Sequence, residues 1–160
     1  VDTGIIIKNK NIVDTNVYGS YLINFNIYIT ITDINSDNNT VTIIFSEAIY
    51  NTPSGSGSIE ANDFELSLTG DNVTLGSTTP TSISLSTNNT NEYILGIDIS
   101  DLSNGSEILT VNPATNSIYN FNGLVVSRIQ TDNSINLNTN LTIELVTFIN
   151  TLKLVFGQKQ

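Results

Sequence analysis

The sequence predicts an all-β domain, and three observations carry that prediction. Apolar and polar residues alternate with a period of two, most clearly over 21–32. Clusters of Asn, Asp, Gly and Ser interrupt this alternation about every 8–12 residues, as turns do between short strands. Nothing between Tyr21 and Leu137 keeps a helical period. Together these features are typical of a β-sandwich.

The first predicted strand covers 21–32 and would run about 40 Å. Turn residues at 33–39 end it, and its length gives the sheet a long edge. Shorter alternating or apolar segments follow, which we expect to be strands, at 41–45, 64–68, 73–75, 83–85, 93–99, 108–111, 124–126 and 135–137. The Pro/Gly/Ser stretch 52–58 predicts a flexible loop. The predicted core consists of Ile23, Phe25, Ile27, Ile29, Val41, Ile43, Phe45, Phe64, Leu66, Leu95, Ile97, Leu109 and Val111.

Two terminal segments lie outside this pattern, so we divide the chain into an arm (1–20), a sandwich domain (21–138) and a tail (139–160). The arm has one apolar run, Ile5, Ile6 and Ile7. The tail has apolar residues at helical spacing, namely Leu145, Phe148, Ile149, Leu152, Val155 and Phe156. This spacing favours an amphipathic helix, although Leu141, Ile143 and Leu145 alternate and leave a strand open for the start of the tail.

Composition excludes several classes of function. The chain has no Cys, His, Met or Trp, and Asp and Glu outnumber Lys and Arg by 15 to 5. A disulfide, a zinc–cysteine site, a haem, an iron–sulfur cluster and a His-based triad are therefore excluded. Five cations cannot supply the basic surface that nucleic acid requires. Carboxylates, Tyr, Ser, Thr and Lys remain for catalysis, and without Trp a sugar-cleaving cleft is disfavoured, so we expect no enzyme and no cofactor.

Compartment follows from the same composition. Asn, Thr and Ser make up roughly 62 of the 160 residues, and such an uncharged polar surface suits an extracellular, cell-surface or virion protein. A chain that begins at Val1 and has no Met is either a processed form or a piece of something longer. The longest apolar stretch, 141–156, is too short and too polar to span a membrane.

Several blocks of the chain resemble a known family. Residues 40–50 read TVTIIFSEAIY, 59–68 read IEANDFELSL and 117–123 read SIYNFNG. They are similar to "TVTITFSEAVY", "LEVSDFVLSL" and "SIYDAAGN" of the bacterial Ig-like repeats in large surface adhesins, which also occur in structural proteins of large DNA viruses. The resemblance covers about 30–138, with Asn120 and Leu124 where the family has Asp and Asn. It implies an Ig-like Greek-key β-sandwich that acts as a spacer or presentation module.

One turn has the start of a calcium loop. Asp33, Asn35 and Asp37 follow the D-x-N-x-D pattern in which alternate oxygens converge on one ion. The pattern then fails, because Asn38 replaces the glycine and Ile44 replaces the bidentate glutamate. An Asx-rich turn explains the same residues without a metal. A second acidic group, Glu60, Asp63 and Glu65, is read either as an inter-loop cation site or as a solvated acidic edge.

The glycan-related signals are weak. Five N-glycosylation sequons begin at Asn38, Asn72, Asn88, Asn104 and Asn140, about as many as this composition gives by chance. Three tyrosines, Tyr18, Tyr28 and Tyr50, lie off the apolar faces and are free to touch a partner.

From these observations we expect a non-enzymatic extracellular structural or adhesive module, part of a cell-surface filament, an adhesin or a virion. The alternative is a carbohydrate-binding module of a secreted protein, with host or cell-surface glycans as partners. Exposed apolar segments mark interaction surfaces. We therefore expect Ile5–Ile7 and the tail stripe to pack on other copies or other subunits, the arm by strand addition. The ends could instead fold back on their own domain or belong to a next repeat.

Overall fold

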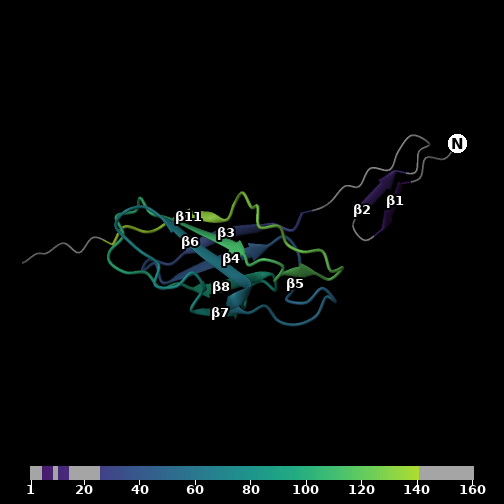
Figure 1. Ribbon diagram of the computed structural model, residues 1–160, viewed down its shortest axis with the longest axis horizontal. Coiled ribbons are helices and arrows are strands. Elements are labelled where there is room, and N and C mark those ends of the chain that lie inside the picture. The colour runs from purple at the N-terminus through teal and green to yellow at the C-terminus, as the bar shows by residue number, and fades with distance from the viewer. Residues whose placement is uncertain (1–4, 9–10, 15–25, 141–160) are drawn as a thin grey trace, which may run out of the picture.

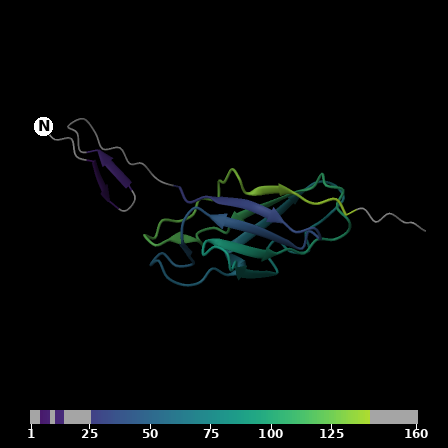
Figure 2. The same cartoon turned by 180° about the vertical axis from the view of Figure 1, so that it is seen from behind.

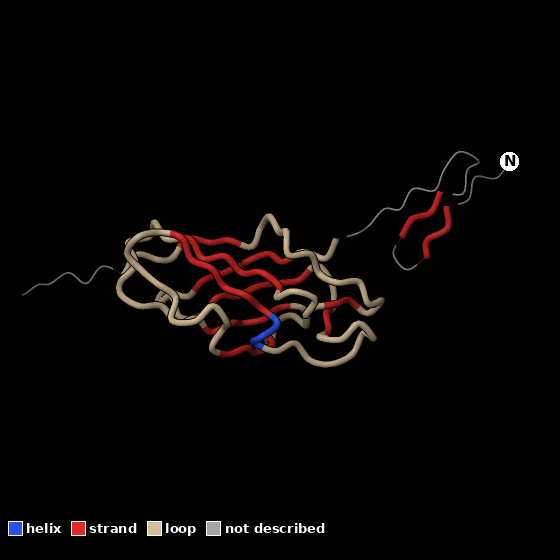
Figure 3. Tube along the Cα trace, viewed as in Figure 1, coloured by secondary structure: helices blue, strands red, loops and turns tan. Residues whose placement is uncertain are grey.

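The structure, a computed structural model, describes residues 5–8, 11–14 and 26–140. These residues form strands, loops and one short 3-10 turn, η1 (Ala61–Asp63), with no α-helix among them (Figure 3). The predicted all-β class is confirmed. The proposed tail helix lies outside the described residues.

Seven strands build two antiparallel sheets that face each other (Figures 1 and 2). The four-stranded sheet has the order β3-β4-β8-β7 and consists of β3 (Ile29–Ile34), β4 (Thr40–Phe45), β8 (Glu92–Gly96) and β7 (Ser82–Leu85). The three-stranded sheet has the order β11-β9-β6 and consists of β11 (Ser134–Asn136), β9 (Ile108–Pro113) and β6 (Phe64–Thr69).

Two short antiparallel pairs complete the described strands. One joins β5 (Ile49–Tyr50) to β10 (Tyr119–Asn120). The other is a hairpin of β1 (Ile5–Lys8) and β2 (Asn11–Asp14), within the segment expected to be an arm.

One core lies between the two large sheets. Phe45 on one sheet and Phe64 on the other meet with their ring centroids 6.2 Å apart. Every predicted core residue in the described part of the chain is buried; Ile23 and Phe25 lie outside it. The core adds residues from loops and short strands, among them Ile34, Ile49, Ile59, Val73, Ile118, Val126 and Leu137.

A β-bulge explains how β3 buries both of its ends. The register with β4 shifts between Ile31 and Asp33. A strand that kept strict alternation from Ile29 would place Ile34 on the opposite face. The extra residue in the bulge turns Ile34 back toward the core, where its exposure is 8%.

Several predicted strands are shorter in the structure. The described part of the first one starts as a strand only at Ile29, because its partner β4 ends at Phe45. The segments 73–75 and 124–126 make single bridges, Leu75 with Ile99 and Val125 with Tyr119. Val73 and Val126 are buried, but neither segment forms a full ladder of backbone bonds.

The chain enters and leaves the sandwich at opposite ends (Figures 1 and 2). At the end we call the entry pole, Ser46 N donates to Tyr28 O at 3.1 Å, just before β3 starts. At the exit pole, where β3 turns into β4, Asn38 and Asn138 hold each other by two hydrogen bonds of 2.7 and 2.8 Å. A sandwich with this arrangement can connect neighbours placed in line.

The predicted free edge is on a different strand. The outer edge of β3 is covered, because Ile31 N donates to Asp132 O at 2.9 Å and Ile29 N donates to the Gln130 side chain at 2.8 Å. The segment 130–132 arrives from the far end of the sequence, so local alternation could not reveal the cover. At the other side of the same sheet β7 is the last strand.

Candidate functional site

The first predicted calcium residues are used to build a turn. The Asn35 side-chain oxygen accepts hydrogen bonds from the backbone N–H of Asn39 and Thr40, at 2.9 and 3.0 Å. Asp33 belongs to β3, opposite Thr42, and is exposed. These hydrogen bonds are those of an Asx turn, and they occupy the Asn35 side-chain oxygen that the calcium interpretation would need as a ligand.

The second acidic group is also divided among separate partners. Asp63 Oδ2 accepts from the backbone N–H of Glu60 at 2.8 Å, as one half of a capping box at η1. Burial raises the pKa of Asp63. Glu65 points elsewhere and pairs with Arg128. Within residues 5–8, 11–14 and 26–140, no group of three or more acidic side chains is arranged to hold a metal ion.

Glu107 is a buried carboxylate that the sequence pattern did not single out. It is fully buried and accepts from Ser103 Oγ at 2.6 Å, from Asn104 N at 3.2 Å and from Asn72 Nδ2 at 3.2 Å. The hydrogen bond from Ser103 is the largest cause of its lowered pKa. These contacts tie the 103–107 turn to the 70–72 turn, which is a structural role.

Three of the sequon asparagines have side chains engaged in hydrogen bonds, and one of them is Asn104, whose Oδ1 accepts from Ser106 N and Oγ. The Asn38 side chain is fully buried, and its Nδ2 donates to Asn138 O. Asn72 Nδ2 donates to Glu107. Glycosylation at Asn38 would require this part of the domain to open.

The residues predicted to mediate assembly fall in two places. Ile5, Ile6 and Ile7 lie in β1 and pair with Asp14, Val13 and Ile12 of β2. The arm's apolar run thus has a strand partner within its own chain. The tail residues Leu145, Phe148, Ile149, Leu152 and Phe156 lie outside the described residues.

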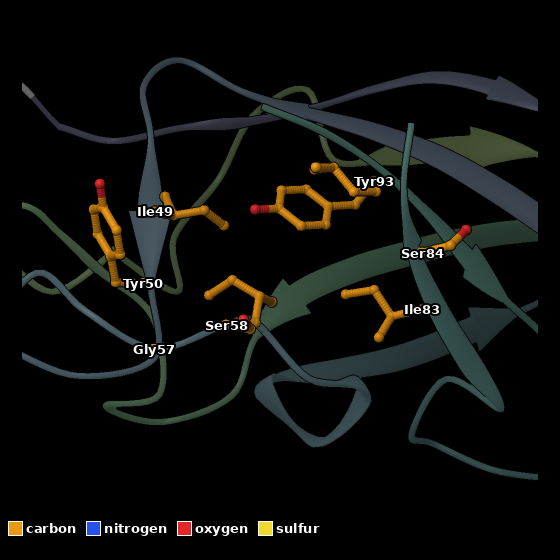
Figure 4. Close-up of a pocket in the computed structure, with 9 residues that line it drawn as sticks. Ile49, Tyr50, Gly57, Ser58, Ile83, Ser84 and Tyr93 are labelled. Atoms are coloured by element: carbon orange, nitrogen blue, oxygen red, sulfur yellow. The ribbon is translucent and has the colours of Figure 1, made fainter. Parts of the chain in front are cut away.

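A pocket of about 340 Å³ opens between the edge of the four-stranded sheet and β5 (Figure 4). Apolar side chains form most of its wall, and we call it the edge pocket. Its lining residues are Ile49, Tyr50, Gly57, Ser58, Ile59, Ile83, Ser84, Leu85 and Tyr93. Ile49 and Ile59 belong to the core, so the pocket is an opening of the core toward solvent.

Tyr93 brings a polar group to this pocket, and its ring is held in place by packing. Its ring meets Phe45 edge to face at 6.0 Å, and Figure 4 shows its hydroxyl directed toward Ile49. Burial is the main cause of the raised pKa of Tyr93, and the neighbouring Tyr50 adds to it. Tyr93 therefore stays a neutral hydroxyl that can donate or accept a hydrogen bond.

Loops that pack closely on each other hold the outer wall. Gly55, with φ of 70°, places its Cα where a Cβ would lie 2.6 Å from the carbonyl oxygen of Phe121. Gly123, with φ of 75°, makes the same kind of approach to Pro53. Thr52, Ser54 and Ser56 hydrogen-bond to one another. The stretch predicted as a flexible loop is thus built into the wall.

The strand beside the pocket has an unused backbone edge. Ser86 N donates to Glu92 O at 2.8 Å, and Ser84 lies opposite Ile94. In an antiparallel ladder alternate residues bond to one neighbour, so the backbone groups of Ile83 and Leu85 point away from β8. No hydrogen bond within the described residues involves these groups. Leu85 is also 53% exposed.

Exposed apolar residues continue from the pocket around the entry pole. Phe121 is 69% exposed and contacts Tyr50 at 6.4 Å between ring centroids. Leu124 and Val125 follow in the same loop and are exposed. Tyr28, which we predicted to be free for a partner, is 54% exposed near the same pole. Tyr50, also predicted free, is half-buried in the pocket wall, and Tyr18 lies outside the described residues.

Sequence reasoning missed the edge pocket because its walls come from four separate stretches of the chain, 49–50, 57–59, 83–85 and Tyr93. Tyr93 packs partly buried against the core, yet nothing local in the sequence shows that β7 ends the sheet.

Comparison with known proteins found no matching family model, no similar curated protein and no similar solved structure. No helix in the described part of the chain is both long and apolar enough to cross a membrane.

Proposed function

We propose that this protein is a non-enzymatic structural or adhesive module of an extracellular surface assembly, either a cell-surface filament or adhesin or a virion component. The observation that carries the proposal is the position of the two ends. The chain enters beside Ser46 at one pole and leaves beside Asn38 at the other. A module built in this way spans the distance between neighbours.

The hydrogen bonds that join the first and last segments support the same function. Asp132 bonds to β3 in a parallel bridge, and Asn138 bonds to the β3–β4 turn. A pull on both ends loads these bonds along the strands, so that several must break together. This arrangement suits a protein module that carries mechanical tension between its two ends.

We further propose that the domain is Ig-like, as the resemblance of residues 40–50 and 117–123 implies. The strand order supports this assignment. Named in chain order as A to G, with the β1–β2 hairpin and the two-residue strands β5 and β10 left out, the strands follow A-B-E-D in one sheet and C-F-G in the other, the order of an immunoglobulin constant-type sandwich.

The edge pocket keeps carbohydrate binding as a second candidate function. Tyr93 brings a ring and a hydroxyl to it, and Tyr50 is among its lining residues with its ring on the other side of β5 (Figure 4). The rest of the wall is mostly aliphatic, and sugars need several polar partners, so the pocket fits an apolar side chain better. A glycan array with the full chain separates the candidates. Binding that is lost in Tyr50→Ala and kept in Tyr28→Ala would favour the carbohydrate function.

Immunogold labelling tests the proposed function directly. Antibodies against the sandwich domain should label the outer surface of intact cells that make the protein, or of particles that carry it. Label confined to the interior, with the protein recovered from the soluble cell extract, would refute the proposal.

A further inference from the structure

The edge of β7 and the edge pocket form one continuous surface. The outward backbone groups of Ile83 and Leu85 offer hydrogen bonds to an added strand, and the pocket lies next to them. Figure 4 shows the Ile83 side chain turned into the pocket and Ser84 turned away. Peptides that add to a sheet edge gain affinity from the backbone bonds and specificity from such side-chain pockets.

The charges of the chain are unequally distributed between the sandwich and its ends. Of the five basic residues only Arg128 lies within 26–140, and it is paired with Glu65. Of the 15 acidic residues all but Asp2, Asp14 and Glu144 lie within that span. The surface of the sandwich therefore attracts a segment that carries positive charge.

The tail has the chemistry that this surface requires. Residues 152–156 read LKLVF, so that Leu152, Leu154 and Phe156 alternate with Lys153 and Val155. A strand with this pattern presents apolar side chains to one face and Lys153 to the other. The arm matches less well, because its apolar run already pairs with β2.

The geometry favours a neighbouring copy as the source of the tail. The edge pocket is at the entry pole, since Leu85 lies opposite Tyr93, and Tyr93 lies opposite Ile43 near the end of β4. The tail starts after Asn140, which bonds to Ser103 at the exit pole. When copies follow one another head to tail, the exit of one faces the pocket of the next, and a heterologous contact of this kind continues into a filament.

We infer that the C-terminal segment of one copy adds as a strand to β7 of the next copy and inserts an apolar side chain of residues 152–156 into the edge pocket. This inference rests on the proposed structural function and specifies which surfaces of two neighbouring copies are in contact. It also assigns the tail's end a strand, whereas its spacing alone favours a helix.

Site-specific crosslinking tests the contact in the full chain, which has no native cysteine. Chains carrying Leu85→Cys are mixed with mass-tagged chains carrying Phe156→Cys and oxidised. We expect a disulfide-linked heterodimer at least tenfold more abundant than from the control mixture of Ile129→Cys with Phe156→Cys. Ile129 is 88% exposed and does not line the pocket. Equal yields in the two mixtures would overturn the inference.

The double variant Leu85→Cys/Phe156→Cys distinguishes the source of the tail. The 16 residues 141–156, fully extended, reach about 53 Å, enough to return to the chain's own pocket. Crosslinked chains of two or more copies are expected. A product made only of internally crosslinked single chains would overturn the neighbouring-copy assignment.

Leu85→Pro tests the strand addition by a second route. Proline removes an N–H that faces away from β8, so the sheet keeps its own bonds. Unfolding midpoints near the parent value will show that the variant folds. We expect its association, measured by light scattering, to weaken at least tenfold, with Ile129→Ala, which keeps its backbone N–H, unchanged. Unchanged association of Leu85→Pro would overturn the inference while leaving the surface location, and so the proposed function, intact.

Discussion

Asn38→Ala should strongly destabilise the domain. Asn38 is fully buried, has a φ of 56° and makes two hydrogen bonds to the backbone of Asn138. Loss of its side chain removes both hydrogen bonds, at about 1 kcal/mol each. Alanine at a positive φ adds about 1–2 kcal/mol. We therefore expect a loss of about 3–4 kcal/mol in the free energy of unfolding.

A pair of variants separates these two contributions. Asn38→Gly removes the same hydrogen bonds but accepts the positive φ, so it should cost about 1–2 kcal/mol less than alanine. Asn88→Ala is the control, because Asn88 is exposed and its side chain makes no hydrogen bond in the structure; it should change stability by less than about 0.5 kcal/mol.

Urea unfolding of the full chain, followed by circular dichroism, measures all three variants. With about 4 °C per kcal/mol for a domain of this size, Asn38→Ala should also lower the Tm by roughly 12–16 °C. Equal stability of Asn38→Ala and Asn38→Gly would refute the argument from backbone strain. Parent-like stability of both variants would show that the hydrogen bonds between Asn38 and Asn138 do not stabilise the domain.

Three further predictions concern the charged groups. The lowered pKa of Glu107 means that its contribution to stability is complete above the unfolded-state value of about 4.3 and is lost as the pH falls through the folded-state value. Glu107→Gln should therefore flatten the acid limb of a plot of unfolding free energy against pH, and an unchanged limb would contradict this cause. Arg128→Ala should lower the free energy of unfolding, measured in urea, by at most about 1 kcal/mol, because the paired side chains of Arg128 and Glu65 are 43% and 50% exposed. A larger loss would contradict this estimate for an exposed ion pair. The Tm in millimolar calcium should equal the Tm in EDTA, because Asn35 already bonds two backbone N–H groups. Calcium at 100 times its dissociation constant would instead add about 2.7 kcal/mol, which scanning calorimetry would detect.

The core was predictable because it depends on local alternation. A residue such as Val41 or Leu109 is buried whenever its strand has one buried face, whatever the strand order. The β3 bulge was not predictable from the sequence, since the shift at Ile31 is stabilised by the pairing with β4 as a whole. The same holds for the cover over β3, which comes from Asp132, about 100 residues away.

The candidate site divides in the same way. The turn at 35–39 was predictable as an Asx-rich turn, because its contacts lie within a few residues of one another. The burial of Glu107 and Asn38 was not, since Asn72 and Asn138 have to arrive from other parts of the chain to satisfy them.

Alternation and composition establish an all-β chain with a strong excess of acidic residues, apolar ends and no residue for thiol, haem or histidine chemistry. Which strand ends the sheet, where the core opens and at which pole the chain leaves follow only from the folded arrangement. Alternation reports only which face of a strand is buried, whereas an open edge and a pocket depend on which distant segments arrive beside it. For that reason β7 and its pocket became visible only in the folded chain.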